Sequence, residues 1–212
     1  MKVLDGDLAA ILADPAISTE TKRERFLQHR GEHKYRLDLP VGDTEQYATS
    51  PRFVLARPME EGKAVHIVTS EQKEPLQFVA RMRMHHGDPQ ELWLATLGFQ
   101  PHNIRQLSAL LDDLPKLTGG VLVSDFFLLK SRAKYEAAKE ALAPYRDRFP
   151  LATLHVHAKI AAAAFSDRHY TIYGSSNLCH CERTEQYTIT TRPELFDFHK
   201  GWITDTLQYA NR

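Results

Sequence analysis

The chain has 212 residues, enough for one substantial hydrophobic core, and its composition is ordinary for a globular protein, with 42% hydrophobic and 25% charged residues. Its 27 basic and 27 acidic residues cancel, which excludes a molecule-wide positive field for nucleic acid. Cys179 and Cys181 are separated by one residue, which argues against a disulfide scaffold. No apolar run approaches the ~20 residues of a membrane span and no signal peptide is recognisable, so we expect a cytoplasmic protein.

The first third of the chain, residues 1–60, is predicted to be an N-terminal extension. The pattern predicts helices over 7–14 and 18–30, and short strands over 34–39 and 52–57 around the turn-rich segment PVGDTEQYATSP. Residues 21–36 hold six Lys or Arg and two Glu, which fits either a solvated helix face or a phosphate-binding patch.

Residues 61–212 are predicted to form the main domain. Apolar β-rich runs alternate with helical patterns, which is typical of an α/β layered fold. We expect strands over 64–70, 91–99, 121–129, 151–165, 170–173 and 185–190, and helices over 75–86, 101–114, 131–148 and 193–209. The turn SDRH predicts an antiparallel hairpin, so the sheet should be mixed. We expect the core to include Trp93, Leu94, Phe126 and Phe127.

The segment HVHAK places His155, His157 and Lys159 at alternate positions of a predicted strand, so all three should point to one face. A charged lysine is costly to bury alone, and an anion is its natural partner. Imidazole adds a nucleophile and proton carrier that titrates near neutral pH.

One strand later the chain reads Gly174-Ser175-Ser176-Asn177. Glycine permits close approach of a ligand, and the hydroxyl and amide groups can donate hydrogen bonds. Donors held around a phosphoryl group stabilise the charge that develops during its transfer. The pattern therefore predicts metal-independent phosphoryl chemistry that needs no cofactor.

These motifs resemble the signature of the phospholipase D superfamily, above all its single-motif branch of metal-independent bacterial nucleases. The resemblance rests on His157-Ala158-Lys159, on Gly174–Asn177 and on Glu185-Gln186-Tyr187, and it spans about residues 154 to 190. It implies a phospholipase D-like fold, a mixed sheet flanked by helices, for the main domain.

The resemblance also implies roles for individual residues. His157 would attack phosphorus and carry a phosphohistidine, while Lys159 and Asn177 would hold the non-bridging oxygens. Ser175 would support that pocket, and Glu185 would fix the tautomer of the histidine. Substrate-binding roles fall to His155, Gly174, Ser176, Arg81 and Arg83.

The family uses two histidines, one as nucleophile and one as general acid, and this chain carries one motif set. The resemblance therefore implies a homodimer in which each copy supplies one histidine. His155 is a less favoured acid within one chain. The aspartate that the family has five residues after the lysine is Ala164 here, and the nearest acid is Asp167 at the predicted hairpin tip.

Nucleic acid is the expected substrate, DNA rather than RNA, because nothing suggests a lipid-binding surface or membrane contact. Binding would rely on basic residues in two places: Lys22, Arg23, Arg25 and Arg30, or Arg81 and Arg83. Ser124-Asp125 could reach the same cleft, whereas His85-His86 should form a solvated helix end.

Three alternatives remain open at this stage. A zinc site could draw on His155, His157, Cys179, His180 and Cys181, although C-x-C is tighter than most zinc spacings. The fold could also persist as a DNA-binding or interaction module with little or no turnover. The third alternative, a lipid phosphodiesterase, is disfavoured by the absence of a basic amphipathic stripe.

Overall fold

The computed structural model describes residues 45–48, 57–69, 74–178 and 185–210, with backbone only at 45–48. All of them belong to one unit of the chain, Leu39–Arg212. The predicted elements at 7–14, 18–30 and 34–39, and residues 52–56 of the strand predicted at 52–57, lie outside the described residues, as do most of the basic positions of the N-terminal extension. The domain boundary at residue 60 stays a prediction.

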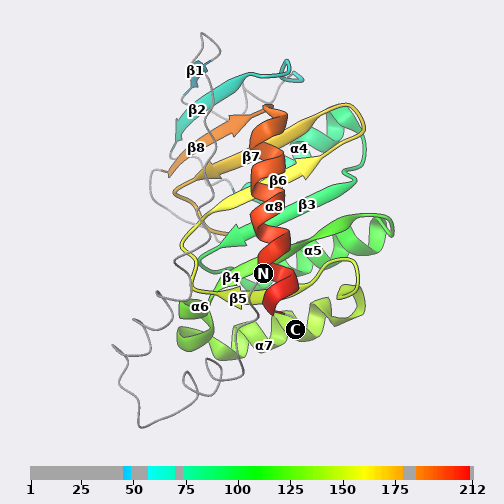
Figure 1. Cartoon of the computed structure of the whole chain (residues 1–212), viewed down its shortest axis with the longest axis vertical. Helices are drawn as coiled ribbons and strands as arrows, with labels where there is room; N and C mark the ends of the chain where they lie inside the picture. Colours follow the sequence, from blue (N-terminus) through cyan, green and yellow to red (C-terminus); the bar gives the residue numbers. More distant parts are fainter. Residues whose placement is uncertain (1–44, 49–56, 70–73, 179–184, 211–212) are drawn as a thin grey trace. The chain divides into compact units, whose positions relative to one another are not determined.

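An eight-stranded mixed sheet organises the described residues, in the order β1-β2-β8-β7-β6-β3-β4-β5 (Figure 1). The strands β3, β4 and β5 run parallel to one another, and β3, β6, β7, β8 and β2 are joined by antiparallel pairings. The strands are β1 (Glu45–Ala48), β2 (Ala64–Thr69), β3 (Glu91–Thr96), β4 (Thr118–Ser124), β5 (Leu151–Leu154), β6 (Ile160–Ala164), β7 (His169–Gly174) and β8 (Glu185–Thr190). The α/β class and the mixed sheet flanked by helices are confirmed.

Helices cover both faces of this sheet. In Figure 1, α8 crosses one face and α4 and α5 lie behind the other, while α7 is drawn beyond β5 at the end of the sheet. The helices are α4 (Pro75–His86), α5 (Pro101–Asp113), α6 (Asp125–Lys130), α7 (Arg132–Leu142) and α8 (Pro193–Ala210), with a 3₁₀ turn at Ala143–Tyr145.

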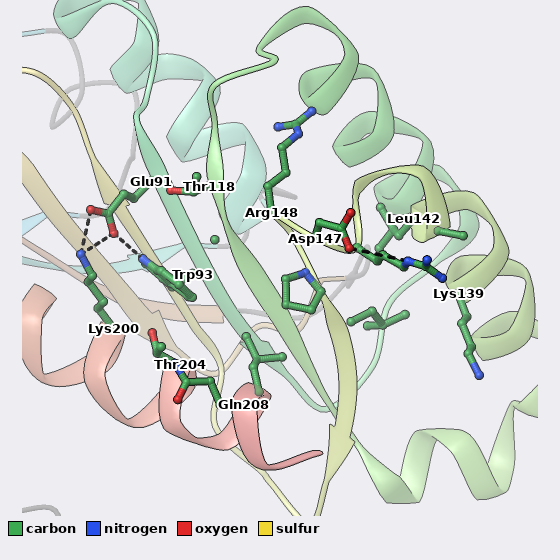
Figure 2. A pocket seen from close by; sticks show the side chains of 16 residues that line it. Glu91, Trp93, Thr118, Lys139, Leu142, Asp147, Arg148, Lys200, Thr204 and Gln208 are labelled. Atoms are coloured by element: carbon green, nitrogen blue, oxygen red, sulfur yellow. Dashed lines mark hydrogen bonds and ion pairs between the residues drawn. The ribbon is translucent and has the colours of Figure 1, made fainter. Parts of the chain in front are cut away.

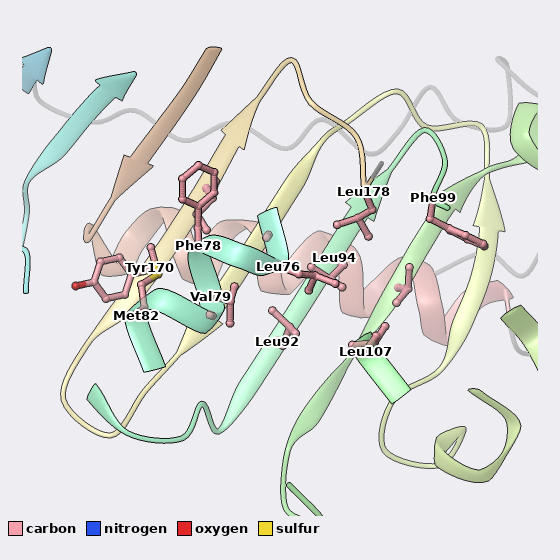
Figure 3. Close-up of a cluster of buried hydrophobic side chains, with 14 of the residues drawn as sticks. Leu76, Phe78, Val79, Met82, Leu92, Leu94, Phe99, Leu107, Tyr170 and Leu178 are labelled. Atoms are coloured by element: carbon pink, nitrogen blue, oxygen red, sulfur yellow. The ribbon is translucent and has the colours of Figure 1, made fainter. Parts of the chain in front are cut away.

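Side chains at alternate positions of the strands pack into two hydrophobic cores, one on each face of the sheet. On β3, Leu92 and Leu94 pack with α4 and α5, whereas Trp93 and Ala95 face α8. Figure 3 shows the first core, in which Phe78 and Met82 of α4 point at the sheet. The period of two along a strand sends neighbouring side chains to opposite faces, so a strand covered on both sides is apolar throughout.

Most predicted elements are confirmed, and four predictions are wrong. Glu45–Ala48, placed in a turn-rich segment, forms β1 and pairs in parallel with β2. Residues 125–129 form a helix, because the side chain of Ser124 caps the backbone NH of Phe126 and ends the strand. The α7 helix ends at Leu142 rather than 148, since Pro144 cannot donate the next helical hydrogen bond.

The fourth wrong prediction concerns residues 155–159, which are not part of a strand. In the sheet, β3 and β4 lie between β5 and β6. The chain must therefore cross the ends of those two strands to pass from β5 to β6. A segment that runs across strand ends cannot join the ladder of hydrogen bonds.

Candidate active site

The predicted catalytic motifs lie together at one edge of the sheet, the edge that is formed by the ends of the strands. The parallel strands β3, β4 and β5 end there, β6 begins there and β7 ends there. Gly174, the last residue of β7, is paired with Tyr187 near the start of β8. The carboxyl ends of parallel strands form the usual position of a ligand site in open α/β sheets.

His157 and Lys159 lie together on the crossing segment. Lys159 Nζ is 3.3 Å from His157 Nδ1 and donates to the backbone oxygen of His157 at 3.2 Å. His155 and His157 are exposed, whereas the intervening Val156 is half-buried. Exposure thus alternates along these three residues, although the segment is not a strand.

Gly174 is required by the packing of β7 against β8. A Cβ atom at this position would lie 2.0 Å from the backbone oxygen of Gln186. The close approach lets the NH of Ser175 donate to that same oxygen at 3.0 Å, while the NH of Gln186 donates to the Ser175 hydroxyl at 3.0 Å. The GS pair of the motif thus sets the register at which β8 leaves the site.

Glu185 is engaged by Ser175, whose hydroxyl donates a short hydrogen bond to its carboxylate. The sequence predicted a contact between Glu185 and His157. Among the described residues, the carboxylate of Glu185 contacts Ser175 and not His157. Glu185 is therefore hydrogen-bonded to the serine of the motif in this structure.

Asn177 and Ser176 differ in their accessibility. The carboxamide oxygen of Asn177 accepts a hydrogen bond from the NH of Leu97 at 3.2 Å, which ties it to the end of β3 and leaves its nitrogen as a donor. Ser176, by contrast, is 3% exposed, and its hydroxyl donates to the backbone oxygen of Asn177. Its role here is to shape the loop from within.

The side chain of Asp125 adds an acidic group that the sequence marked only weakly. Asp125 opens α6 directly after β4, and its carboxylate oxygens lie 3.2 and 3.3 Å from His155 Nδ1. The pair links α6 to the crossing segment. Its signal in the sequence was an acid directly after a buried strand, next to the N-cap Ser124.

Two of the predicted substrate-binding residues are not brought to this edge. Arg81 and Arg83 lie on α4, where Arg83 pairs with Asp88 at 2.6 Å and Arg81 donates to the sulfur of Met84. The end of α4 packs against the β6–β7 hairpin through a contact of His86 with Asp167. That hairpin lies at the opposite end of β6 from Lys159.

The same contact corrects the prediction of a solvated His85-His86 turn. His86 is buried, its Nδ1 lies 2.9 Å from Asp167 Oδ2, and its Nε2 lies 2.8 Å from the Tyr170 hydroxyl. The hydrogen bond from His86 is the main cause that lowers the pKa of Asp167 below its ordinary value. Ala164, where the family has its aspartate, also lies at this far end, opposite His169.

The zinc alternative falls largely outside the described residues, because Cys179, His180 and Cys181 lie in the segment 179–184. Within the residues that the structure does describe, no group of three or more His, Cys, Asp or Glu is placed to hold a metal ion.

A separate pocket of about 820 Å³ lies away from these residues (Figure 2). Its lining includes Glu91, Thr118 and Leu151, the first residues of the parallel strands, so it lies at the opposite edge of the sheet. Glu91 is held there by Lys200 at 2.7 Å and by the indole NH of Trp93 at 2.8 Å. Trp93, predicted as core, is half-buried between this pocket and α8.

No family model matches the chain, and no curated protein matches it. Among solved structures, a crystal structure of polyphosphate kinase from Porphyromonas gingivalis is similar, with 15% sequence identity and a TM-score of 0.44. The match covers 69% of this chain and 26% of that one, so this chain spans about a quarter of the length of that protein. A similarity of this size does not assign a function, so the function is inferred from the residues of the chain itself.

None of the helices in the described part of the chain combines the length and apolar character needed to cross a membrane.

Proposed function

We propose that this protein is a metal-independent phosphodiesterase of the phospholipase D type that acts as a nuclease. The observation that carries the proposal is the meeting of the HxK and GSxN motifs at one edge of the sheet. His157 and Lys159 are 3.3 Å apart there, and the loop after β7 presents Ser175 and Asn177 at the same edge.

In the proposed first step, an imidazole nitrogen of His157 attacks phosphorus. A P–N bond forms and the P–O bond to the leaving group breaks, while a histidine from a second copy of the chain protonates the departing oxygen. The ammonium of Lys159 and the carboxamide nitrogen of Asn177 are suited to stabilise the two non-bridging oxygens, because both are donors anchored on the protein.

In the second step, the neutral imidazole of the second copy takes a proton from water. The water oxygen attacks phosphorus, the P–N bond breaks and His157 is released. The products are an alcohol and a phosphomonoester, and the histidines return to their starting protonation states. The requirement for two histidines, with one motif set per chain, supports a homodimeric site.

The test uses the purified full chain with bis(p-nitrophenyl) phosphate and with single- and double-stranded oligonucleotides, each with and without EDTA. We expect hydrolysis that survives the chelator. His157→Ala should lower it by about three orders of magnitude or more, because it removes the nucleophile. Rapid quenching in alkali, followed by mass spectrometry, should detect the covalent adduct on His157.

A matched control is His85→Ala, which removes an exposed histidine on α4. It should retain wild-type rates. Full activity in His157→Ala would disprove the proposed mechanism, and strict dependence on a divalent ion would favour the metal alternative.

A further inference from the structure

Two of the four exposed large hydrophobic side chains among the described residues lie on α6. Phe126 is 52% exposed and Leu129 is 80% exposed, and the others are Val68 and Met84. The sequence predicted that Phe126 belongs to the core, and this prediction is wrong. A helix places residues three apart on the same face, so Phe126 and Leu129 share the outer side of α6.

The position of α6 is fixed by its inner side. The ring of Phe127 packs on Phe99 with centroids 4.6 Å apart, and it lies so close to Gly98 that a Cβ there would be 2.5 Å from the ring. Phe127 and Leu128 therefore supply the apolar anchor of this short helix. The helix is thus held in place by Phe127 and Leu128, and this anchoring does not require the exposed ring of Phe126.

Three basic residues follow the exposed ring in the sequence. Lys130, Arg132 and Lys134 lie four, six and eight positions after Phe126, and all three are exposed. Lys130 Nζ lies 5.8 Å from the centroid of Phe126, a cation–π distance. The nearest acids in the sequence are Asp125, which pairs with His155, and Glu136 one turn further along α7.

This surface adjoins the candidate active site. Asp125, directly before Phe126, holds His155 at 3.2 Å, and His155 is two residues from His157. A chain bound across α6 would thus lead to the proposed nucleophile. We define the α6 surface as Phe126, Leu129 and Lys130 of α6 together with Arg132 and Lys134 of the first turn of α7, where Lys134 also donates to Gln100 Oε1 at 3.1 Å.

We propose that the α6 surface binds single-stranded nucleic acid, with a base stacked on Phe126 and phosphates held by Lys130, Arg132 and Lys134. The inference rests on the proposed function, because it names the form of substrate that the same site would receive. Aromatic rings beside cations are the combination that single-strand binding proteins use, since every base has a face that can stack. In a duplex the bases are already stacked on one another and do not offer that face.

A second copy of the chain is the other possible occupant, and charge disfavours it. A two-fold interface brings a patch against the same patch of the second copy, so the charges of Lys130, Arg132 and Lys134 would be gathered with three like charges. A polyanion gains from the same three charges, because it releases counterions on binding.

The experiment measures fluorescence anisotropy of labelled 15-residue oligodeoxythymidylate and oligouridylate, and of a duplex of the same length, with the full chain carrying His157→Ala so that the probe stays intact. Phe126→Ala should weaken single-strand binding about tenfold, the typical effect of losing one stacking contact. Phe126→Trp should preserve the affinity and Phe126→Leu should not. Lys130→Gln should lower the slope of log Kd against log salt by about 0.7.

Two matched controls lie elsewhere on the described surface. Met84→Ala removes a side chain that is 70% exposed on α4, and Lys116→Gln removes an exposed charge beyond α5. Both should leave affinity and salt slope unchanged. Melting temperatures within about 2 °C of the parent would show that each variant is folded.

The outcomes separate this inference from the proposed function. If bis(p-nitrophenyl) phosphate is not hydrolysed by the wild-type chain but Phe126→Ala still loses affinity and Phe126→Trp keeps it, the α6 surface stands and the catalytic proposal falls. The inference is overturned if Phe126→Ala binds as well as the parent or if leucine restores binding as fully as tryptophan. It is also overturned if Phe126→Ala weakens binding of the duplex as much as binding of the single strands. A further contrary outcome is that Phe126→Ala dissociates a dimer while oligonucleotide affinity stays the same.

Discussion

At the scale of single residues, Gly174 shows how a motif residue can be required by the backbone rather than by chemistry. The space for a side chain is filled by the backbone oxygen of Gln186, only 2.0 Å from the position of a Cβ atom. Because that oxygen belongs to a paired strand, it cannot move aside without breaking hydrogen bonds between β7 and β8. Glycine is thus specified here by the contact between two strands.

Gly174→Ala should lower the free energy of unfolding by about 1–3 kcal/mol, the usual cost of forcing an extra methyl group into a packed site. Activity should also fall, since Ser175 and Asn177 follow directly on the displaced strand end. Gly201→Ala is the control, because nothing lies within 4 Å of its added Cβ and the residue is within α8. It should stabilise the protein by up to about 1 kcal/mol. Urea denaturation of both variants gives the two signs, and equal signs would contradict this account.

Single residues also mark where the sequence was informative and where it was not. The GSxN residues could be placed at a strand end because a recognisable strand precedes them, whereas the HxK residues were predicted within a strand and lie outside one. His86 and Phe126 could not, since neither a histidine at a helix end nor a phenylalanine after a strand reveals its tertiary neighbours. The burial of His86 depends on Asp167, 81 positions away.

At the scale of elements, the order of the strands in the sheet explains why the alternating sequence pattern predicted a strand that does not form. An alternating pattern at 155–159 predicts a strand, yet these residues must cross the ends of β3 and β4 to reach β6. The order of strands follows from long-range pairing, which no local pattern contains. The apolar run 121–129 is similarly ambiguous, and Ser124 ends the strand by capping α6.

The helix α8, on the face of the sheet opposite α4 and α5, carries a contact that is sensitive to acid. Burial lowers the pKa of His199 to about 4. Its Nδ1 accepts a hydrogen bond from the indole NH of Trp202 at 3.0 Å, so the neutral ring carries its proton on Nε2. The folded protein therefore holds this histidine neutral at pH values at which the unfolded chain binds a proton.

His199→Gln should flatten the dependence of stability on pH. With a folded pKa of about 4 and an ordinary value of 6.5, the unfolded chain binds more protons between those values, so wild-type stability falls as pH drops from 6.5 to 4. The loss attributable to this group is about 3 kcal/mol at most. Denaturation curves at pH 7, 5.5 and 4 should show a smaller decline in the variant. An identical decline would mean that His199 is protonated at no cost in the fold.

At the scale of the whole molecule, the single motif set is the feature with the largest consequence. One chain offers His157 once, with its neighbour His155 already paired to Asp125. An in-line displacement needs a nucleophile and an acid on opposite sides of phosphorus. Two copies related by a two-fold axis satisfy this requirement, because each presents the same residue to a shared centre.

Mixing wild-type chain with His157→Ala tests this arrangement directly. After subunit exchange at equal amounts, about one quarter of dimers carry two intact histidines. Activity should therefore fall to about one quarter of that of the same total amount of wild type. Chains that act alone would retain about one half. Mixing with Met84→Ala in place of His157→Ala should leave activity unchanged, and a sample combined immediately before the assay should give one half because exchange has not occurred. Exchange can be confirmed with a mass-tagged copy. If activity then stays at one half after prolonged incubation, the second chain takes no part in the mechanism, and His155 is the remaining candidate for the general acid.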